Sequence, residues 1–262
     1  MGGALPKMGI GGFIVLLLLS FIFKKDFFAL LGGGQPTAGT ATEGSPVPTT
    51  PAEEKQIEFV SFVLDDAQST WSQIFQSQGQ TYQPARLGIF TDAVRTACGT
   101  GQSGMGPFYC PADQRVYIDL TFYNELQDRF GAPGDFAQAY VIAHEIGHHV
   151  QNVLGISDQV REAQQRDPGS ANELSVRLEL QADCLAGVWA HSTSRRDILH
   201  EGDVEEALGA AAAVGDDRIQ SQSMSGVNPE TWTHGSSEQR MQWFQNGYQS
   251  GDIERCDTFA AR

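Results

Sequence analysis

Two histidines four residues apart, with a glutamate directly after the first, constrain this chain more than any other feature. They are His144 and His148, and the glutamate is Glu145. Residues at i and i+4 share one face of a helix, so both imidazoles can bind a single metal ion. Glu145 directly follows His144, so it is rotated by about 100° around the helix axis. From there its carboxylate can reach a metal-bound water. The pattern predicts two zinc ligands and a catalytic base on one helix.

The residues around this pattern predict the helix that it requires. Gly134 and Asp135 provide an N-terminal cap, and Leu154 and Gly155 provide a stop signal. Apolar residues recur between them at helical spacing: Phe136, Ala139, Tyr140, Ala143, Gly147 and Val150. Two histidines on a helix can also be ordinary solvated residues. A third ligand is therefore needed to favour a metal site.

Glu179 is the strongest candidate for that third ligand. It lies 35 residues after His144, inside a helical pattern that runs roughly from 171 to 191. A catalytic zinc site has three protein ligands and leaves its fourth position open. Asp183 follows Glu179 by one helical turn, so one carboxylate can bind the metal while the other accepts a proton from a ligand imidazole. We expect Asp183 to orient His144 in this way.

Three blocks of the sequence resemble a known family. They are His144-Glu-Ile-Gly-His-His-Val-Gln, Glu179-Leu-Gln-Ala-Asp-Cys and Thr233-His-Gly-Ser-Ser-Glu-Gln-Arg. The first two look like the HExxH and ExxAD segments of gluzincin metallopeptidases. Together the three resemble the bacterial putative neutral zinc metallopeptidase family, from about Ile57 to the C-terminus and at the membrane-anchored N-terminus. The resemblance implies a zinc-dependent endopeptidase with a zincin-like fold.

The third block leaves the role of His234 open. In gluzincin-like sites a C-terminal residue commonly stabilises the oxyanion that forms on the cleaved carbonyl, and the resemblance gives His234 that catalytic role. Arg240 completes a similarly placed segment in membrane-associated relatives. Alternatively, His234 caps the helix expected over 236–248.

An uncharged apolar run near the N-terminus predicts a membrane segment. The run extends from Met8 to Phe23, and further apolar residues continue to Leu31. A spanning helix needs about 17–25 apolar residues, so we predict one transmembrane helix within residues 1–31. A cleaved signal peptide is the alternative, although no clear small-x-small cleavage site follows the run.

The chain after the expected anchor divides into a tether and one domain. Residues 32–56 are rich in Gly, Pro, Thr and Ala and contain almost no large apolar residue, which is typical of a flexible linker. Residues 57–262 are long enough for one domain with a sizeable core. A tethered domain would encounter membrane-associated substrates readily.

Four cysteines, all located after the expected anchor, bear on the cellular compartment. Cys98 and Cys110 flank a glycine-rich loop, and Cys184 can pair with Cys256. Four cysteines allow three pairings, and buried thiols in a reducing cytosol are the alternative. We expect two disulfides, a single-pass protein of the bacterial cell membrane, and an extracytoplasmic catalytic domain.

The remaining patterns predict a mainly helical α+β domain with a small antiparallel sheet. Expected strands cover 87–90, 108–109 and 116–120, and expected helices cover 57–75, 121–130, 202–214 and 237–248. In the resembling enzymes an edge strand before the zinc helix binds extended substrate. Residues 104–109 or the strand at Val116 are the candidates for that edge.

Charge narrows the set of partners. The net charge of −15 and the isoelectric point near 4.7 disfavour nucleic acid. The predicted function is a membrane-anchored endopeptidase in which Glu145 activates a zinc-bound water to hydrolyse a peptide bond in a protein or peptide substrate. A non-proteolytic zinc amidohydrolase and a membrane-tethered scaffold with a structural zinc remain as alternatives. The sequence predicts neither the physiological substrate nor the oligomeric state.

Overall fold

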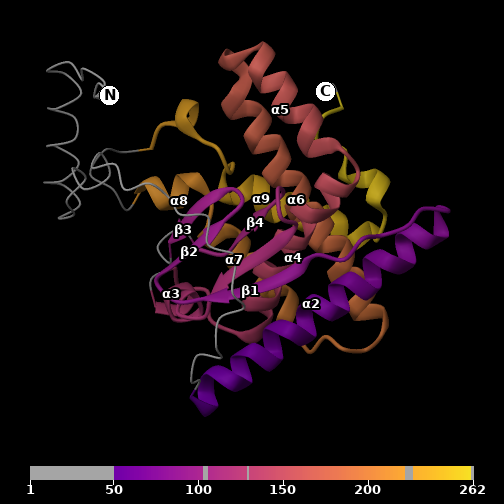
Figure 1. Cartoon of the computed structure of the whole chain (residues 1–262), viewed down its shortest axis with the longest axis vertical. Helices are drawn as coiled ribbons and strands as arrows, with labels where there is room; N and C mark the ends of the chain where they lie inside the picture. The colour runs from indigo at the N-terminus through magenta and orange to yellow at the C-terminus, as the bar shows by residue number, and fades with distance from the viewer. Residues whose placement is uncertain (1–49, 103–105, 129, 222–226, 261–262) are drawn as a thin grey trace, which may run out of the picture. The chain divides into compact units, whose positions relative to one another are not determined.

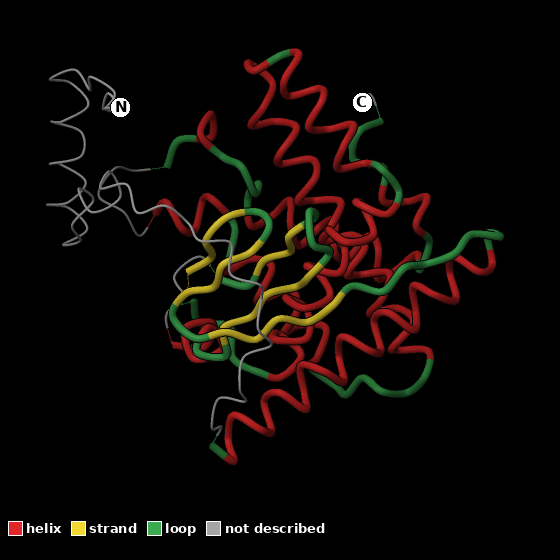
Figure 2. Tube along the Cα trace, viewed as in Figure 1, coloured by secondary structure: helices red, strands yellow, loops and turns green. Residues whose placement is uncertain are grey.

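The structure, a computed structural model, describes residues 50–102, 106–128, 130–221 and 227–260. They belong to one unit of the chain, which begins at Thr49. The expected membrane anchor, 1–31, and most of the expected tether, 32–56, lie outside the described residues. No described helix combines the length and apolar character needed to cross a membrane. Helices make up most of this unit and the strands form a small group among them (Figure 2).

The first described helix, α2 (Pro51–Ser77), begins earlier than the sequence pattern predicted. The expected boundary between tether and domain was residue 57. Thr50 caps the helix and exchanges hydrogen bonds with Glu53 in a capping box, and Pro51 occupies the first turn. This local signal starts the helix before its apolar face begins. Figure 1 shows α2 along one border of the domain. Its buried face contains Val60, Val63, Leu64, Ala67, Trp71 and Phe75.

The main sheet is mixed, whereas the sequence analysis expected an antiparallel one. It has the order β1 (Arg86–Phe90), β5 (Arg115–Asp119), β4 (Phe108–Cys110). A short turn joins β4 to β5, so these two strands are antiparallel. The longer segment from β1 to β5 passes through β2 (Ala93–Thr96), β3 (Gly99–Gln102) and β4. It returns the chain in its original direction, so β1 and β5 are parallel. Strands β2 and β3 pair separately as an antiparallel ribbon.

The remaining α-helices follow the predicted pattern with two additions. One is the short helix α8 (Asp216–Ser221). The other is α5 (Ile156–Arg166), which begins after Gly155 and buries only Val160. Its largely polar sequence gave no clear apolar stripe. The other elements are α3 (Phe122–Asp128), α4 (Asp135–Val153), η3 (Pro168–Ser170), α6 (Ala171–Arg195), α7 (Asp203–Ala213), η4 (Pro229–Thr231), α9 (Ser237–Ser250) and η5 (Ile253–Cys256).

Two glycines allow helix α6 to pack closely between α4 and α9. A Cβ atom at Gly147 of α4 would lie 2.9 Å from the carbonyl oxygen of Ala182 on α6. A Cβ atom at Gly247 of α9 would overlap the carbonyl of Cys184 on the same helix. Only glycine permits both approaches, because any side chain would push the backbones apart. Gly147 thereby brings α6 against the helix that carries the paired histidines.

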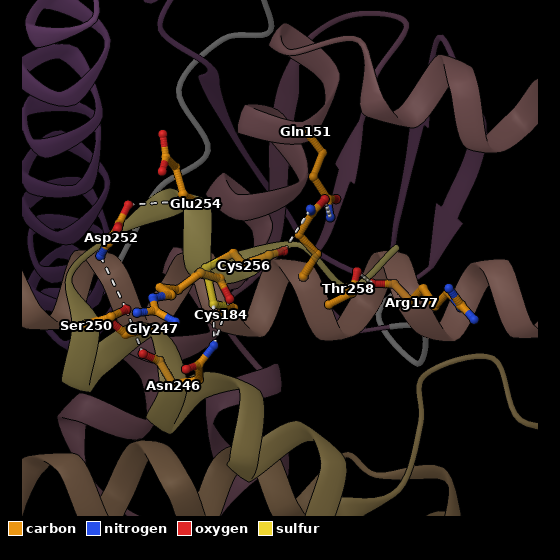
Figure 3. Close-up of a disulfide and its surroundings, with 12 residues drawn as sticks. Gln151, Arg177, Cys184, Asn246, Gly247, Ser250, Asp252, Glu254, Cys256 and Thr258 are labelled. Atoms are coloured by element: carbon orange, nitrogen blue, oxygen red, sulfur yellow. Dashed lines mark hydrogen bonds between the residues drawn. A yellow bond between two sulfur atoms is a disulfide. The ribbon is translucent and has the colours of Figure 1, made fainter. Parts of the chain in front are cut away.

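Both expected disulfides are present. Cys98, which lies between β2 and β3, pairs with Cys110 at the end of β4. Cys184 of α6 pairs with Cys256 of η5 and ties the C-terminal segment to that helix (Figure 3). None of the four cysteines remains as a free thiol.

Candidate metal centre

The structure brings His144, His148 and Glu179 together between α4 and α6. Their candidate ligand atoms all lie within 4.8 Å of one another. The Nε2 atom of His144 is 3.2 Å from Oε2 of Glu179, and Nε2 of His148 is 3.4 Å from Oε1. Ligand atoms bound at 2.0–2.1 Å around a tetrahedral zinc ion lie roughly 3.3 Å apart. The spacing and the chemistry of these three side chains therefore fit a zinc ion.

Asp183 lies behind His144. Its Oδ1 is 2.8 Å from Nδ1 of His144. An ionised carboxylate only accepts hydrogen bonds, so Nδ1 carries the hydrogen and Nε2 keeps its lone pair. Burial opposes the charge on Asp183, but Arg240 and His144 together outweigh burial and hold the pKa of this carboxyl below its usual range.

Two further residues complete this buried group, and sequence reasoning did not assign either of them to it. Arg240 of α9 donates from Nε to Oδ2 of Asp183 at 2.8 Å and from Nη2 to Oδ1 at 2.9 Å. The hydroxyl of Tyr140 also donates to Oδ1. From the sequence, Arg240 was recognised only as part of the third block. Tyr140 was recognised only as an apolar position of its helix. No sequence signal linked them to Asp183.

Glu145 and Tyr109 of β4 both border the site. Burial raises the pKa of Glu145 in spite of the two nearby imidazoles. The Tyr109 hydroxyl lies 2.9 Å from Nδ1 of His149 and accepts from Asn152, both on α4. His149 is fully buried and donates from Nε2 to the Gln83 carbonyl, so it packs inside the domain.

A cleft of about 700 Å³ runs past these side chains. Of the two candidate substrate strands, β4 borders this cleft and is an edge of its sheet, whereas β5 is the central strand. Apolar residues line one part of the cleft: Phe108, Phe122, Phe130, Val141, Val214 and Ile219. Residues of α5 line another part: Ser157, Val160, Arg161 and Gln164. The cleft can therefore receive a ligand that passes the three candidate metal ligands.

His234 lines the same cleft, although it comes from a distant loop before α9. Asp216 accepts hydrogen bonds from the backbone N–H groups of Thr233, His234 and Gly235. Its Oδ1 also lies 3.3 Å from Nδ1 of His234, and this hydrogen bond raises the pKa of the imidazole. Ser236 caps α9, so the alternative reading of His234 as the cap is wrong.

Comparison with known proteins places the whole chain in one family. The uncharacterized protein YpfJ of Escherichia coli (strain K12) is 49% identical over 261 residues, which cover 98% of this chain and 89% of that protein. Rv2575 of Mycobacterium tuberculosis (strain ATCC 25618 / H37Rv) and Mb2605 of Mycobacterium bovis (strain ATCC BAA-935 / AF2122/97) are each 49% identical over 191 residues. Those residues cover 69% of this chain and 64% of each relative. No solved structure matches the chain. The family described as "Putative neutral zinc metallopeptidase" matches residues 1–259, and the chain belongs to that family.

Proposed function

We propose that this protein is a membrane-anchored, zinc-dependent endopeptidase with a zincin-like catalytic domain. One observation carries the proposal: the Nε2 atoms of His144 and His148 lie 3.2 and 3.4 Å from the two carboxylate oxygens of Glu179. The three side chains lie at one cleft, and the family name independently implies zinc. The nearby Glu145 supplies the base that a hydrolytic site needs.

The donor set favours a catalytic zinc site over a structural one. Within the part of the chain that the structure describes, this group of candidate ligands contains two histidines, one glutamate and no fourth His, Cys, Asp or Glu. Structural zinc sites usually have four protein ligands, whereas catalytic sites have three and an open position. The cleft provides access to that position. A membrane-tethered scaffold with a structural zinc is therefore the weaker interpretation.

Each side chain has a defined task in the proposed reaction. Zinc, when bound by His144, His148 and Glu179, supplies a Lewis acid that polarises the substrate carbonyl and lowers the pKa of a bound water. Glu145 accepts the proton of the attacking water at its carboxylate and delivers it to the leaving amide nitrogen.

His234 and Asp183 have two further roles, one toward the substrate carbonyl and one toward a zinc ligand. Asp216 accepts from Nδ1 of His234 and raises the pKa of that ring, and the doubly protonated imidazolium then donates from Nε2 to the carbonyl oxygen as negative charge develops there. Asp183, held by Arg240, keeps the proton of His144 on Nδ1. Its role is to orient the ligand and not to contact the substrate.

An extended peptide is the substrate class that this cleft suits best. Strand β4 is the edge of the main sheet beside the cleft, and an extended segment can add to such an edge through backbone hydrogen bonds. The apolar part of the lining provides contacts for large apolar side chains. A peptide lying along β4 would pass Glu145, because Tyr109 of β4 and Glu145 line the same cleft.

The proposed location is the outer side of the bacterial cell membrane. It rests on the apolar run at Met8–Phe23, on the Gly/Pro/Thr-rich segment that follows it, and on the two disulfides of the domain. We infer that residues 1–31 anchor the protein and that the catalytic domain lies outside the cytoplasm. Protease treatment of intact spheroplasts tests this: the domain should be degraded without lysis.

The activity is tested by incubating the full-length, zinc-loaded protein with a library of unstructured peptides and identifying new termini by mass spectrometry. We expect internal cleavage that stops when a chelator removes the metal. Zinc binding without any new peptide terminus would contradict an endopeptidase. In that case hydrolysis of small non-peptide amides would identify a zinc amidohydrolase.

A further inference from the structure

A buried glutamine connects two parts of the candidate metal centre. Gln151 lies on α4, three residues after His148, and is fully buried. Its Oε1 is 2.9 Å from Nδ1 of His148. Its Nε2 is 2.7 Å from the backbone carbonyl of Leu178, the residue before Glu179 on α6. Gln151 therefore contacts one candidate ligand and the backbone beside another.

The carbonyl of Leu178 determines how the Gln151 amide is oriented. A backbone carbonyl only accepts hydrogen bonds, so the NH₂ group of Gln151 must face it. The amide oxygen then faces His148, and Nδ1 of that ring must carry a hydrogen. In a neutral imidazole the other nitrogen, Nε2, keeps its lone pair. This Nε2 is the atom that lies 3.4 Å from the Glu179 carboxylate.

The hydrogen bonds continue from Gln151 to the C-terminal disulfide. Nε2 of Gln151 also donates to Oε1 of Gln181 at 3.1 Å, and Nε2 of Gln181 donates to the carbonyl of Cys256 at 2.9 Å. This second carbonyl fixes the orientation of the Gln181 amide by the same argument. Cys256 is bonded to Cys184 of α6 (Figure 3), so the far end of the chain of hydrogen bonds is covalently held.

We propose that Gln151 is a positioning residue that sets the tautomer and ring orientation of His148, with Gln181 and the disulfide-bonded Cys256 holding its amide in place. The inference deepens the proposed function, on whose metal centre it rests. Asp183 makes the corresponding bond to His144, so both histidines have Nδ1 engaged and Nε2 directed to Glu179.

The first test measures zinc affinity of the full-length protein by competition with a chelator. Gln151→Met keeps the length of the side chain but removes the oxygen that accepts from His148. We expect zinc affinity to fall about 10–100-fold, the usual effect of losing such an outer partner. Gln181→Met should cause a smaller loss in the same direction, because Leu178 still holds the Gln151 amide.

Thr258→Val is the matched control for loosening of the same segment. The Thr258 hydroxyl donates to the carbonyl of Arg177 at 2.7 Å, so it ties the C-terminal segment to α6 without joining the chain of hydrogen bonds through Gln151. The zinc affinity of Thr258→Val should equal that of the unmodified protein. Equal losses in Thr258→Val and Gln151→Met would overturn the proposal, as would unchanged affinity in Gln151→Met.

A second variant separates positioning from stability. Gln151→Glu restores an oxygen toward His148 but faces the Leu178 carbonyl with another acceptor, so its fold should be no more stable than that of Gln151→Met. We nevertheless expect it to bind zinc more tightly than Gln151→Met and to give a cobalt absorption spectrum closer to that of the unmodified protein. Affinity that merely follows stability across the two variants would refute a positioning role.

The outcomes distinguish this inference from the proposed function. If the unmodified protein binds zinc but cleaves no peptide, the endopeptidase proposal fails while the affinity measurements still test Gln151. If the protein cleaves peptides and Gln151→Met retains full zinc affinity, only the positioning role fails. Should Gln151→Glu not fold, comparison of Gln151→Met with Thr258→Val decides.

Discussion

The guanidinium of Arg240 makes two hydrogen bonds to the carboxylate of Asp183, at 2.8 and 2.9 Å, and both side chains are buried. The two residues join α9 to α6 directly behind His144. Because the pair is buried, removing one partner leaves the other charge without compensation. The ion pair therefore stabilises both the packing of the two helices and the orientation of a candidate metal ligand.

Replacing Arg240 with methionine should lower the free energy of unfolding by about 3–5 kcal/mol, because the Asp183 charge would remain buried and unpaired. Urea denaturation of the full-length protein measures this change. Glu173→Gln is the control, since Glu173 pairs with Arg177 at the surface and such pairs contribute at most about 1 kcal/mol. Equal effects of the two substitutions would contradict a buried ion pair at Arg240.

The sequence predicts those parts of the site in which partners lie within one or two helical turns. His144, Glu145 and His148 share a helix whose apolar spacing was readable, and Glu179 and Asp183 share the next long helix. Helical periodicity is a local property, so their relative directions follow from the chain alone. The placement of Asp183 behind His144 then required only that the two helices meet.

The remaining parts depend on contacts between distant segments, which periodicity does not encode. Asp183 and Arg240 are 57 residues apart, and Tyr109 and Glu145, which line the same cleft, lie on a strand and on a helix. The mixed sheet was not predicted for a similar reason, because alternation of apolar and polar residues identifies strands but not their pairing.

The early start of α2, by contrast, has a local signal in the sequence that the prediction did not use. Thr50 and Glu53 form a capping box at the start of this helix.

Glu145→Gln should retain zinc but lose hydrolysis, because the amide cannot accept the proton of the attacking water. We expect kcat/KM to fall by roughly 10²–10⁴-fold, the usual contribution of general acid–base catalysis. Metal analysis of the same preparation should give the zinc content of the unmodified protein. Undiminished cleavage by the Gln variant would remove Glu145 from the mechanism.

Glu179→Gln should weaken zinc binding and abolish the stabilisation that zinc gives the fold. A metal at 100 times its Kd stabilises the folded state by about 2.7 kcal/mol, since it binds the folded chain and not the unfolded one. Thermal unfolding with and without a chelator should show this difference in the unmodified protein and little of it in the variant. A chelator effect of equal size in both proteins would place the metal elsewhere.

Asp66 should make stability depend on pH in the acidic range. Burial opposes ionisation of this carboxyl, but hydrogen bonds from Arg196 and Trp189 outweigh burial and lower its pKa. A carboxyl with a lowered folded-state pKa stabilises the fold above its ordinary pKa of about 3.9 and loses that contribution as pH falls below it. The stability gap between the unmodified protein and Asp66→Asn should therefore be constant from pH 7 to 5 and shrink toward pH 3 in urea titrations. A gap that stays constant to pH 3 would contradict this account.

His234→Ala should reduce the rate of the chemical step without releasing the metal. His234 lines the cleft but is not among the three candidate ligands, and Asp216 still binds the backbone of the loop in the variant. Loss of one oxyanion donor typically lowers kcat by about 10²–10³-fold, so we expect that decrease with KM and zinc content unchanged. His200→Ala is the control, because the His200 side chain is 89% exposed and lies outside the cleft lining. An unchanged kcat in His234→Ala would assign the oxyanion to another donor, whereas a rise in KM alone would make His234 a substrate-binding residue.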